Sequence, residues 1–290
     1  MESPISDYGT LLEYYSRRAL THESDALKAV AGIMRRVSVK LGYPMIEGLP
    51  TGAFDAFILF EGTYLARRHG FPSYSWAGWR GGIRYSFPRD ISKWLSKGTW
   101  IVWNKRSGGA LSPVWDPATH KPPSACGAPE TGYQTRVLFR HPEIAIGTAQ
   151  TTVAGAIPPP PQFSNFPYSI LQFWTLVTFY RLHSWSDDIS AWRAIINKNG
   201  TICGKVILDG FDYFPFFDSD GVFEFLVLSE TGRLYESPMD ERRRDEYNVM
   251  LVEWIDGVAE RRGIGEIYKD AVLSANSYPP GPVWKEILLG

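Results

Sequence analysis

The chain has 290 residues, of which 44% are hydrophobic and 21% charged, with a formal net charge of −1. This length lies at the upper end for one domain and also fits two intimately packed halves; a single compact domain over residues 1–290 is predicted, and the size of its core is not limiting. A charge so close to zero provides no electrostatic attraction to nucleic acid or to an anionic membrane, so neither is an expected partner.

Residues 1–70 are predicted to be mainly helical. An amphipathic helix is expected over residues 25–41, with Ser24 as its N-cap and Gly42 as its stop. Its apolar stripe consists of Leu27, Val30, Ala31, Met34, Val37 and Leu41. A second, shorter helix is expected over residues 52–61, capped by Thr51. The side chains expected to face inward from it are Phe54, Phe57 and Ile58, whereas Arg35, Arg36 and Lys40 of the first helix are expected in solvent.

Residues 71–290 are predicted to be mainly β. Short β-prone runs alternate there with Gly, Pro, Asn and Asp, which is typical of an antiparallel sheet. The runs are 82–87, 99–104, 135–140, 170–182, 195–198, 201–208, 222–228, 249–255 and 258–262. Residues 170–182 fit a strand or a buried helix equally well, because apolar residues stand at both odd and even positions and would cover both faces of a strand. Asn199-Gly200 and Asp256-Gly257 each predict a tight hairpin.

Two long irregular stretches, residues 107–131 and 154–167, interrupt these runs. Loops of this length in a compact domain are either lids and partner-binding segments or surface excursions. The predicted fold class is therefore α+β: amino-terminal helices packed on a mostly antiparallel, barrel-like β body with long irregular loops.

The sequence contains no recognisable cofactor or metal motif, so no cofactor and no metal are predicted. Phosphate-binding glycine loops are absent, and the five histidines are dispersed without metal-ligand spacing. Cys126 and Cys203 are expected to be reduced thiols, a lone bridge being the alternative. Residues 168–182 are apolar but too short to span a bilayer. Without a signal peptide at the start, a cytoplasmic protein is expected.

Aromatic residues make up 14% of the chain. They build a large core or line a cavity for an apolar ligand, and composition does not decide between these. His183 precedes Asp187 and Asp188, a grouping that suits acid–base chemistry or a structural turn. Arg80 and Arg84 lie beside two tryptophans and are expected either to pack on an indole face or to line a cavity.

The most distinctive segment is Phe71-Pro72-Ser73-Tyr74-Ser75-Trp76-Ala77-Gly78-Trp79, which follows the basic pair Arg67-Arg68. It resembles a signature in the carboxy-terminal region of fungal heterokaryon-incompatibility (HET) proteins, with Tyr74 in place of a tryptophan. The similarity extends over residues 14–85 and 245–290 and is weak between them. In that family the HET domain lies upstream of this region. Because Met1 stands only a few residues before the similar segment, we expect a stand-alone chain without a HET domain.

The resemblance implies two classes of function. Stand-alone proteins that resemble this region include candidate pericyclases, among them norbornene-forming Diels–Alder enzymes. It therefore implies a cofactor-free cyclase that acts on a hydrophobic terpenoid or polyketide intermediate in fungal secondary metabolism. The residues expected to contact the substrate are Trp76, Trp79, Trp174 and Tyr180, and the candidate catalytic donors are His183, Arg80 and Tyr85. The alternative is a protein-interaction or regulatory module derived from a HET protein.

Overall fold

The structure is a computed structural model that describes residues 4–88, 90–107, 110–115, 166–184, 191–210, 221–232, 245–274 and 276–290. The helices, with short 3₁₀ helices labelled η, are α1 (Pro4–Ser16), η1 (Glu23–Asp25), η2 (Lys28–Val30), α2 (Ala31–Leu41), η3 (Thr51–Ala53), α3 (Phe54–Phe57), η4 (Trp76–Gly78), α4 (Ile91–Lys97) and α6 (Lys269–Leu273). The short strands of the first half are β1 (Met45–Ile46), β2 (Leu49–Pro50), β3 (Glu61–Gly62), β4 (Ala66–Arg67), β5 (Trp79–Arg80), β6 (Ile83–Arg84), β7 (Asn104–Ser107) and β8 (Ala110–Pro113). The longer strands are β9 (Ile170–Ser184), β10 (Trp192–Ile196), β11 (Ile202–Leu208), β12 (Phe223–Glu230), β13 (Glu246–Ile255), β14 (Val258–Tyr268) and β15 (Val283–Leu289).

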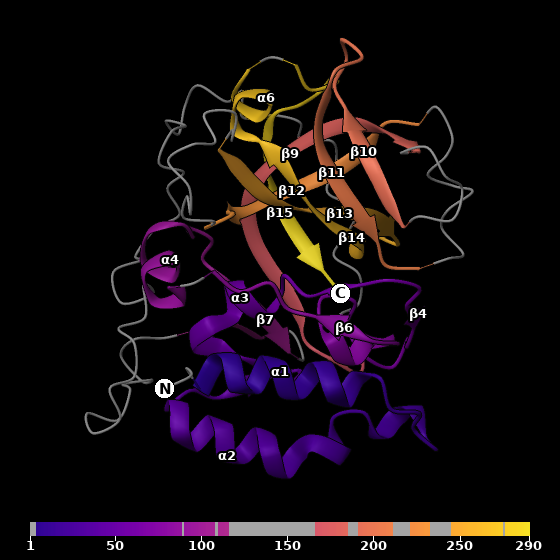
Figure 1. Cartoon of the computed structure of the whole chain (residues 1–290). Coiled ribbons are helices and arrows are strands. Elements are labelled where there is room, and N and C mark those ends of the chain that lie inside the picture. The colour runs from indigo at the N-terminus through magenta and orange to yellow at the C-terminus, as the bar shows by residue number, and fades with distance from the viewer. Residues whose placement is uncertain are drawn as a thin grey trace, which may run out of the picture.

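The long strands form a barrel-like body that rests on the helical part (Figure 1). β10, β11, β14, β13, β12 and β9 follow one another as antiparallel neighbours, and β9 also pairs with β10, which joins the two ends of this order into a ring. β15 pairs with the first half of β9 and touches β14 through a single parallel pair, Ala259 with Leu289. This architecture confirms the predicted α+β class and its mostly antiparallel sheet.

Both predicted hairpins are confirmed, because their turns are encoded locally. Gly200 has a φ of 78°, and the Asn197 side-chain oxygen accepts from the N–H groups of Asn199 and Thr201. Asp256 and Gly257 both have positive φ, at 50° and 81°, the backbone of a type I′ turn. Residues 170–182, for which a strand and a helix were equally possible, lie within strand β9.

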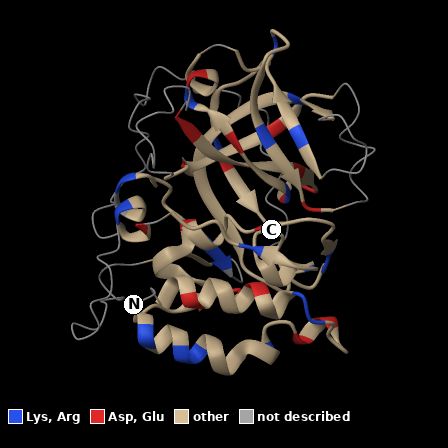
Figure 2. Cartoon of the chain, in the orientation of Figure 1, with Lys and Arg blue, Asp and Glu red and all other residues tan. Residues whose placement is uncertain are grey.

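The predicted helix over residues 25–41 begins later than expected. Residues 23–30 form the 3₁₀ helices η1 and η2, and the α-helix starts at Ala31. The reason is that the Tyr15 hydroxyl donates to the Ala26 carbonyl, while the Val30 N–H bonds to Leu27 instead. Ser24 is therefore not an N-cap, whereas Gly42 ends α2 in the left-handed conformation as predicted. Arg35, Arg36 and Lys40 are exposed as expected, and α2 carries no acidic residue (Figure 2).

The second predicted helix is also shorter than residues 52–61. α3 ends at Phe57, and in the segment that follows the carbonyls of Ile58 and Phe60 accept hydrogen bonds from Arg261. Thr51 does not cap it, since its hydroxyl donates to the Pro44 carbonyl. The prediction that Phe54, Phe57 and Ile58 face inward is confirmed, with no side-chain exposure at any of them.

Helix α1, which no sequence pattern above predicts, joins α2 to the rest of the molecule (Figure 1). It buries Ile5, Tyr8 and Leu12, spaced three and four apart, and the Tyr8 hydroxyl donates to the Gly48 carbonyl at 2.9 Å. One cluster of buried apolar residues extends from α1 through the short strands to β15. Within the described ranges, no helix has the length and apolar character needed to cross a bilayer.

Several predictions concern residues outside the described part of the chain. These are the run 135–140, most of the irregular stretches 107–131 and 154–167, Cys126, Asp187 and Asp188. The start of the first stretch differs from prediction, since Ala110–Pro113 pairs with Asn104–Ser107 as a hairpin. Cys203 is a buried free thiol.

Candidate functional site

The segment Phe71–Trp79 is a tightly packed structural unit, which we call the knot. Trp76 and Trp79 are each 1% exposed, and their indole N–H groups donate to the carbonyls of Gly48 at 3.2 Å and Ser73 at 2.8 Å. The fully buried Tyr74 donates its hydroxyl to the Ser169 carbonyl at 2.7 Å. Buried aromatic residues whose polar atoms all bond to backbone are part of the scaffold.

The same knot holds the carboxy-terminal end of the chain. The Ser73 backbone N–H donates to the Gly290 carbonyl at 2.8 Å, and the Ser73 hydroxyl bonds to that carbonyl as well. The Ser73 hydroxyl also accepts from the Arg261 backbone N–H in β14 at 2.8 Å. One serine therefore connects the knot, the barrel and residue 290.

The tightest point of the knot is Gly78. A Cβ atom at this position would lie 2.2 Å from the Pro72 carbonyl oxygen, so only glycine fits. The Gly78 carbonyl accepts from the Arg68 backbone N–H at 2.7 Å and from Nη1 of Arg67 at 3.0 Å. This close approach fixes the basic pair Arg67-Arg68 against the knot.

The knot thereby forms one wall of a cavity of about 340 Å³, which we call the arginine groove. It is lined by Glu23, Ser24, Ala66, Arg67, Arg68, His69, Gly70, Phe71 and Arg80. Its volume falls within the range of roughly 300–1,000 Å³ that is usual for small-molecule sites. Its chemistry is that of a site for an anion or a carbonyl oxygen, because arginine side chains only donate hydrogen bonds.

The three arginines of the groove differ in how they are held. Arg67 forms its floor, with a side chain only 4% exposed, Nη1 bonded to three carbonyls and Nη2 3.5 Å from Glu260. Arg68 is also buried, and it donates from Nη1 to the Trp79 carbonyl at 2.6 Å and from Nε to Glu23. Arg80 is 63% exposed, with Nη1 3.8 Å from the Glu23 carboxylate. Arg80 can therefore move toward a ligand, whereas Arg67 and Arg68 are fixed.

The residues predicted from sequence do not gather at one site. Arg80 lines the arginine groove, and Trp79 lies beneath it with Arg67 5.6 Å from its ring centre. The cation on this indole is thus Arg67, while Arg80 and Arg84 point to Glu23 and Glu61. Trp76 is packed in the core.

The other predicted residues lie in different surroundings. Trp174 is 49% exposed on β9. Tyr180 is buried inside the barrel, donates to the Ala271 carbonyl at 3.0 Å, and has its pKa raised by that burial. His183 is exposed, three residues further along the same strand, on the opposite face. Burial raises the pKa of Tyr85 well above its ordinary value, and its hydroxyl has no hydrogen-bond partner among the residues described.

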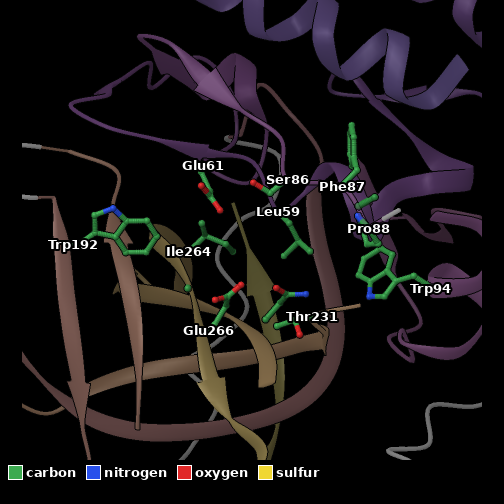
Figure 3. A pocket seen from close by; sticks show the side chains of 13 residues that line it. Leu59, Glu61, Ser86, Phe87, Pro88, Trp94, Trp192, Thr231, Ile264 and Glu266 are labelled. Carbon is green, nitrogen blue, oxygen red and sulfur yellow. The ribbon is translucent and has the colours of Figure 1, made fainter. Parts of the chain in front are cut away.

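A smaller cleft lies between the helical part and the barrel, and the segment Ser86-Phe87-Pro88 forms part of its wall (Figure 3). Its volume is about 50 Å³, and its lining residues are Ala56, Leu59, Glu61, Ser86, Phe87, Pro88, Trp94, Trp192, Thr231, Asn248, Ile264, Gly265 and Glu266. Figure 3 shows the carboxylates of Glu61 and Glu266 extending into it from facing elements. Arg84 bonds to Glu61 at 2.7 Å, and Lys205 lies 3.4 Å from Glu266, so cations already neutralise both. This cleft accommodates a small group rather than a whole ligand.

Sequence reasoning missed Arg68, Glu23 and Phe71 as members of the site. The basic pair Arg67-Arg68 before the knot was the available signal, but Glu23 lies 45 residues from Arg68 and no local pattern connects them. Among the residues that the structure describes, no three His, Cys, Asp or Glu side chains are placed to hold a metal ion. No protein-family model, curated protein or solved structure matches the chain.

Proposed function

We propose that this chain is a cofactor-free cyclase of the pericyclase type, acting in the cytoplasm on a hydrophobic terpenoid or polyketide intermediate. The arginine groove is its substrate site. The observation that carries this proposal is that Arg80, a donor predicted from sequence, lines a cavity of about 340 Å³ beside Arg68 and Phe71. The relationship to HET proteins stays a prediction.

The groove supplies what a cycloaddition needs from a protein. Such a reaction forms two carbon–carbon σ bonds from π bonds, and no proton, electron or leaving group departs. The protein therefore contributes by holding the diene and the dienophile close together, which reduces the entropy lost on reaching the transition state. A guanidinium that donates to the dienophile's carbonyl stabilises the negative charge that shifts onto this oxygen. Arg80 has the freedom to make this contact, and the Phe71 side chain offers an apolar surface beside it.

The test is to incubate the purified full-length chain with linear terpenoid and polyketide precursors and to analyse the products on a chiral column. We expect acceleration over the uncatalysed reaction and an excess of one enantiomer. Arg80→Gln should lower the rate about 10- to 100-fold, at or below the effect of removing one donor from a preorganised oxyanion site. Arg84→Gln is the matched control, because Arg84 is 62% exposed, similar to Arg80, but pairs with Glu61 outside the groove. Rates and stereochemistry equal to those with heat-denatured protein for every precursor would contradict the proposal.

The second candidate is the protein-interaction or regulatory module. The observation in its favour is that Trp76, Trp79 and Tyr180 are each buried and bonded to backbone carbonyls, and none of them lines the groove. Their aromatic rings then serve stability, and a partner would bind at the surface of the groove. Titration with a glutamate-rich peptide discriminates the two, since an interaction module binds the peptide and the cyclase prefers the precursor.

A further inference from the structure

The groove already contains a carboxylate of the chain itself. Glu23 accepts a hydrogen bond from Nε of Arg68 through one oxygen, and its other oxygen lies 3.8 Å from Nη1 of Arg80. A single carboxylate therefore spans two guanidinium groups, with a charge-assisted hydrogen bond to Arg68 and a longer ion pair to Arg80. Two positive charges share one negative charge at this point, so the groove attracts a further anion.

Arg68 requires an anion at all times. Its side chain is 6% exposed, its backbone N–H is fixed to Gly78, and its Nη1 is fixed to the Trp79 carbonyl. A guanidinium so deeply buried is strongly destabilising without a negatively charged partner. Any molecule that removes Glu23 from Arg68 must therefore bring an oxyanion in its place.

The backbone that carries Glu23, in contrast, is weakly held. It lies in the three-residue helix η1, which contains no buried residue and has no side-chain cap. Of the two backbone hydrogen bonds of this turn, one measures 3.1 Å and the other is long, at 3.4 Å, and the Glu23 side chain is 47% exposed. Segments with so few buried contacts open locally at small free-energy cost. The buried Ala26, bonded by Tyr15, marks where the fixed part of the chain resumes.

We infer that Glu23 is a built-in placeholder, and that the ligand of the arginine groove carries a carboxylate group that displaces it. The inference rests on the proposed function for the site, and it narrows the substrate class to hydrophobic carboxylic acids. No covalent bond changes in this exchange, because one carboxylate replaces another on Arg68 and Arg80. The placeholder keeps the buried guanidinium paired in the free protein and lowers the affinity for weakly bound acids.

The experiment is calorimetric titration of the full-length chain with a linear isoprenoid carboxylic acid and with its methyl ester. The wild-type protein should bind the acid more tightly than the ester. Glu23→Gln removes the competing charge and should tighten acid binding about 3- to 10-fold, which corresponds to a partly exposed ion pair, and should leave ester binding unchanged. Glu61→Gln is the control, because Glu61 also pairs with an arginine, Arg84, but lines the smaller cleft and not the groove.

Each outcome decides the inference. Equal binding of acid and ester, no binding of the acid, or no effect of Glu23→Gln would overturn it. So would tighter binding of a glutamate-rich peptide than of the isoprenoid acid, which would assign the placeholder to a protein partner. Acid binding that Glu23→Gln tightens, without turnover of any precursor, would support the inference while refuting the cyclase. Stereoselective turnover of neutral precursors alone, unaffected by Glu23→Gln, would support the cyclase and refute the placeholder inference.

Discussion

Replacing Gly78 by alanine tests whether the knot both stabilises the fold and builds the groove. The added Cβ would lie 2.2 Å from the Pro72 carbonyl oxygen, whereas real Cβ contacts stay beyond 3.0 Å, so this backbone atom must retreat by about 0.8 Å. The Pro72 carbonyl accepts from Ser75, and the Gly78 carbonyl accepts from Arg68, so the shift strains both hydrogen bonds. Overpacking costs about 1–3 kcal/mol, and a weakened hydrogen bond adds about 1 kcal/mol, which gives a total of about 2–4 kcal/mol.

The assay for Gly78→Ala is thermal unfolding followed by circular dichroism. For a chain of this size each kcal/mol lowers Tm by about 2 °C, so the expected decrease is about 4–8 °C. The same variant should bind the isoprenoid acid more weakly, because Arg68 moves with the Gly78 carbonyl. Gly70→Ala is the control: it lies in the groove wall, but a Cβ there meets no atom within 4 Å, and its stability should change by less than about 0.5 kcal/mol. A Tm for Gly78→Ala within 1 °C (about 0.5 kcal/mol) of the control's would refute the reasoning.

Two further predictions concern buried charges. Arg261→Met leaves the fully buried carboxylate of Asp209 unpaired and should cost about 3–5 kcal/mol in urea unfolding. Combining Arg261→Met with Asp209→Leu should recover only part of that loss, because the buried carbonyls of Ile58 and Phe60 still lack their donor. Additive costs of the two substitutions would contradict this. Burial raises the pKa of Glu47, although the Ser169 N–H and Lys105 oppose the shift. The charged form of Glu47 therefore destabilises the fold, and the free energy of unfolding increases as pH falls through the pKa of the folded state. Glu47→Gln should therefore stabilise the protein more at pH 7 than at pH 4.5 in urea unfolding, and an equal or reversed difference would show that the carboxylate is not penalised.

The parts of the fold that could be predicted are those encoded within a few residues. The Asn199-Gly200 and Asp256-Gly257 turns need a positive φ that few other pairs adopt, so their hairpins follow from the sequence. Ring closure does not follow in this way. It depends on the register between β10 and β9, in which Arg193 pairs with Ser184. The alternation of side chains along the two strands is compatible with many registers, so it does not predict this one.

The helix ends were predicted wrongly for a related reason. The Ala26 carbonyl, which the Val30 N–H would use in a continuous helix, bonds to Tyr15 instead, and Arg261 holds the backbone after α3 through the Ile58 carbonyl, 203 residues away. Propensity and capping rules consider only neighbours along the chain, and a distant donor that takes a helical carbonyl overrides them. The predicted inward face of α3 survived because the 3.6-residue period does not depend on where the helix ends.

The site illustrates the same limit and gives the signature segment its meaning. The sequence does not distinguish a tryptophan that lines a cavity from one that packs in a core. The two differ in which groups their indole N–H donates to. Here these partners are the carbonyls of Gly48 and Ser73, which no side-chain identity specifies. These backbone hydrogen bonds hold the two indoles in the core, and neither indole lines the arginine groove. The knot positions two arginines of the groove: Gly78 and Trp79 fix the buried Arg68, and β5 carries the exposed Arg80. The segment Phe71–Trp79 therefore supports two arginines of the groove, and its tryptophans, which were predicted to contact a substrate, pack in the core instead.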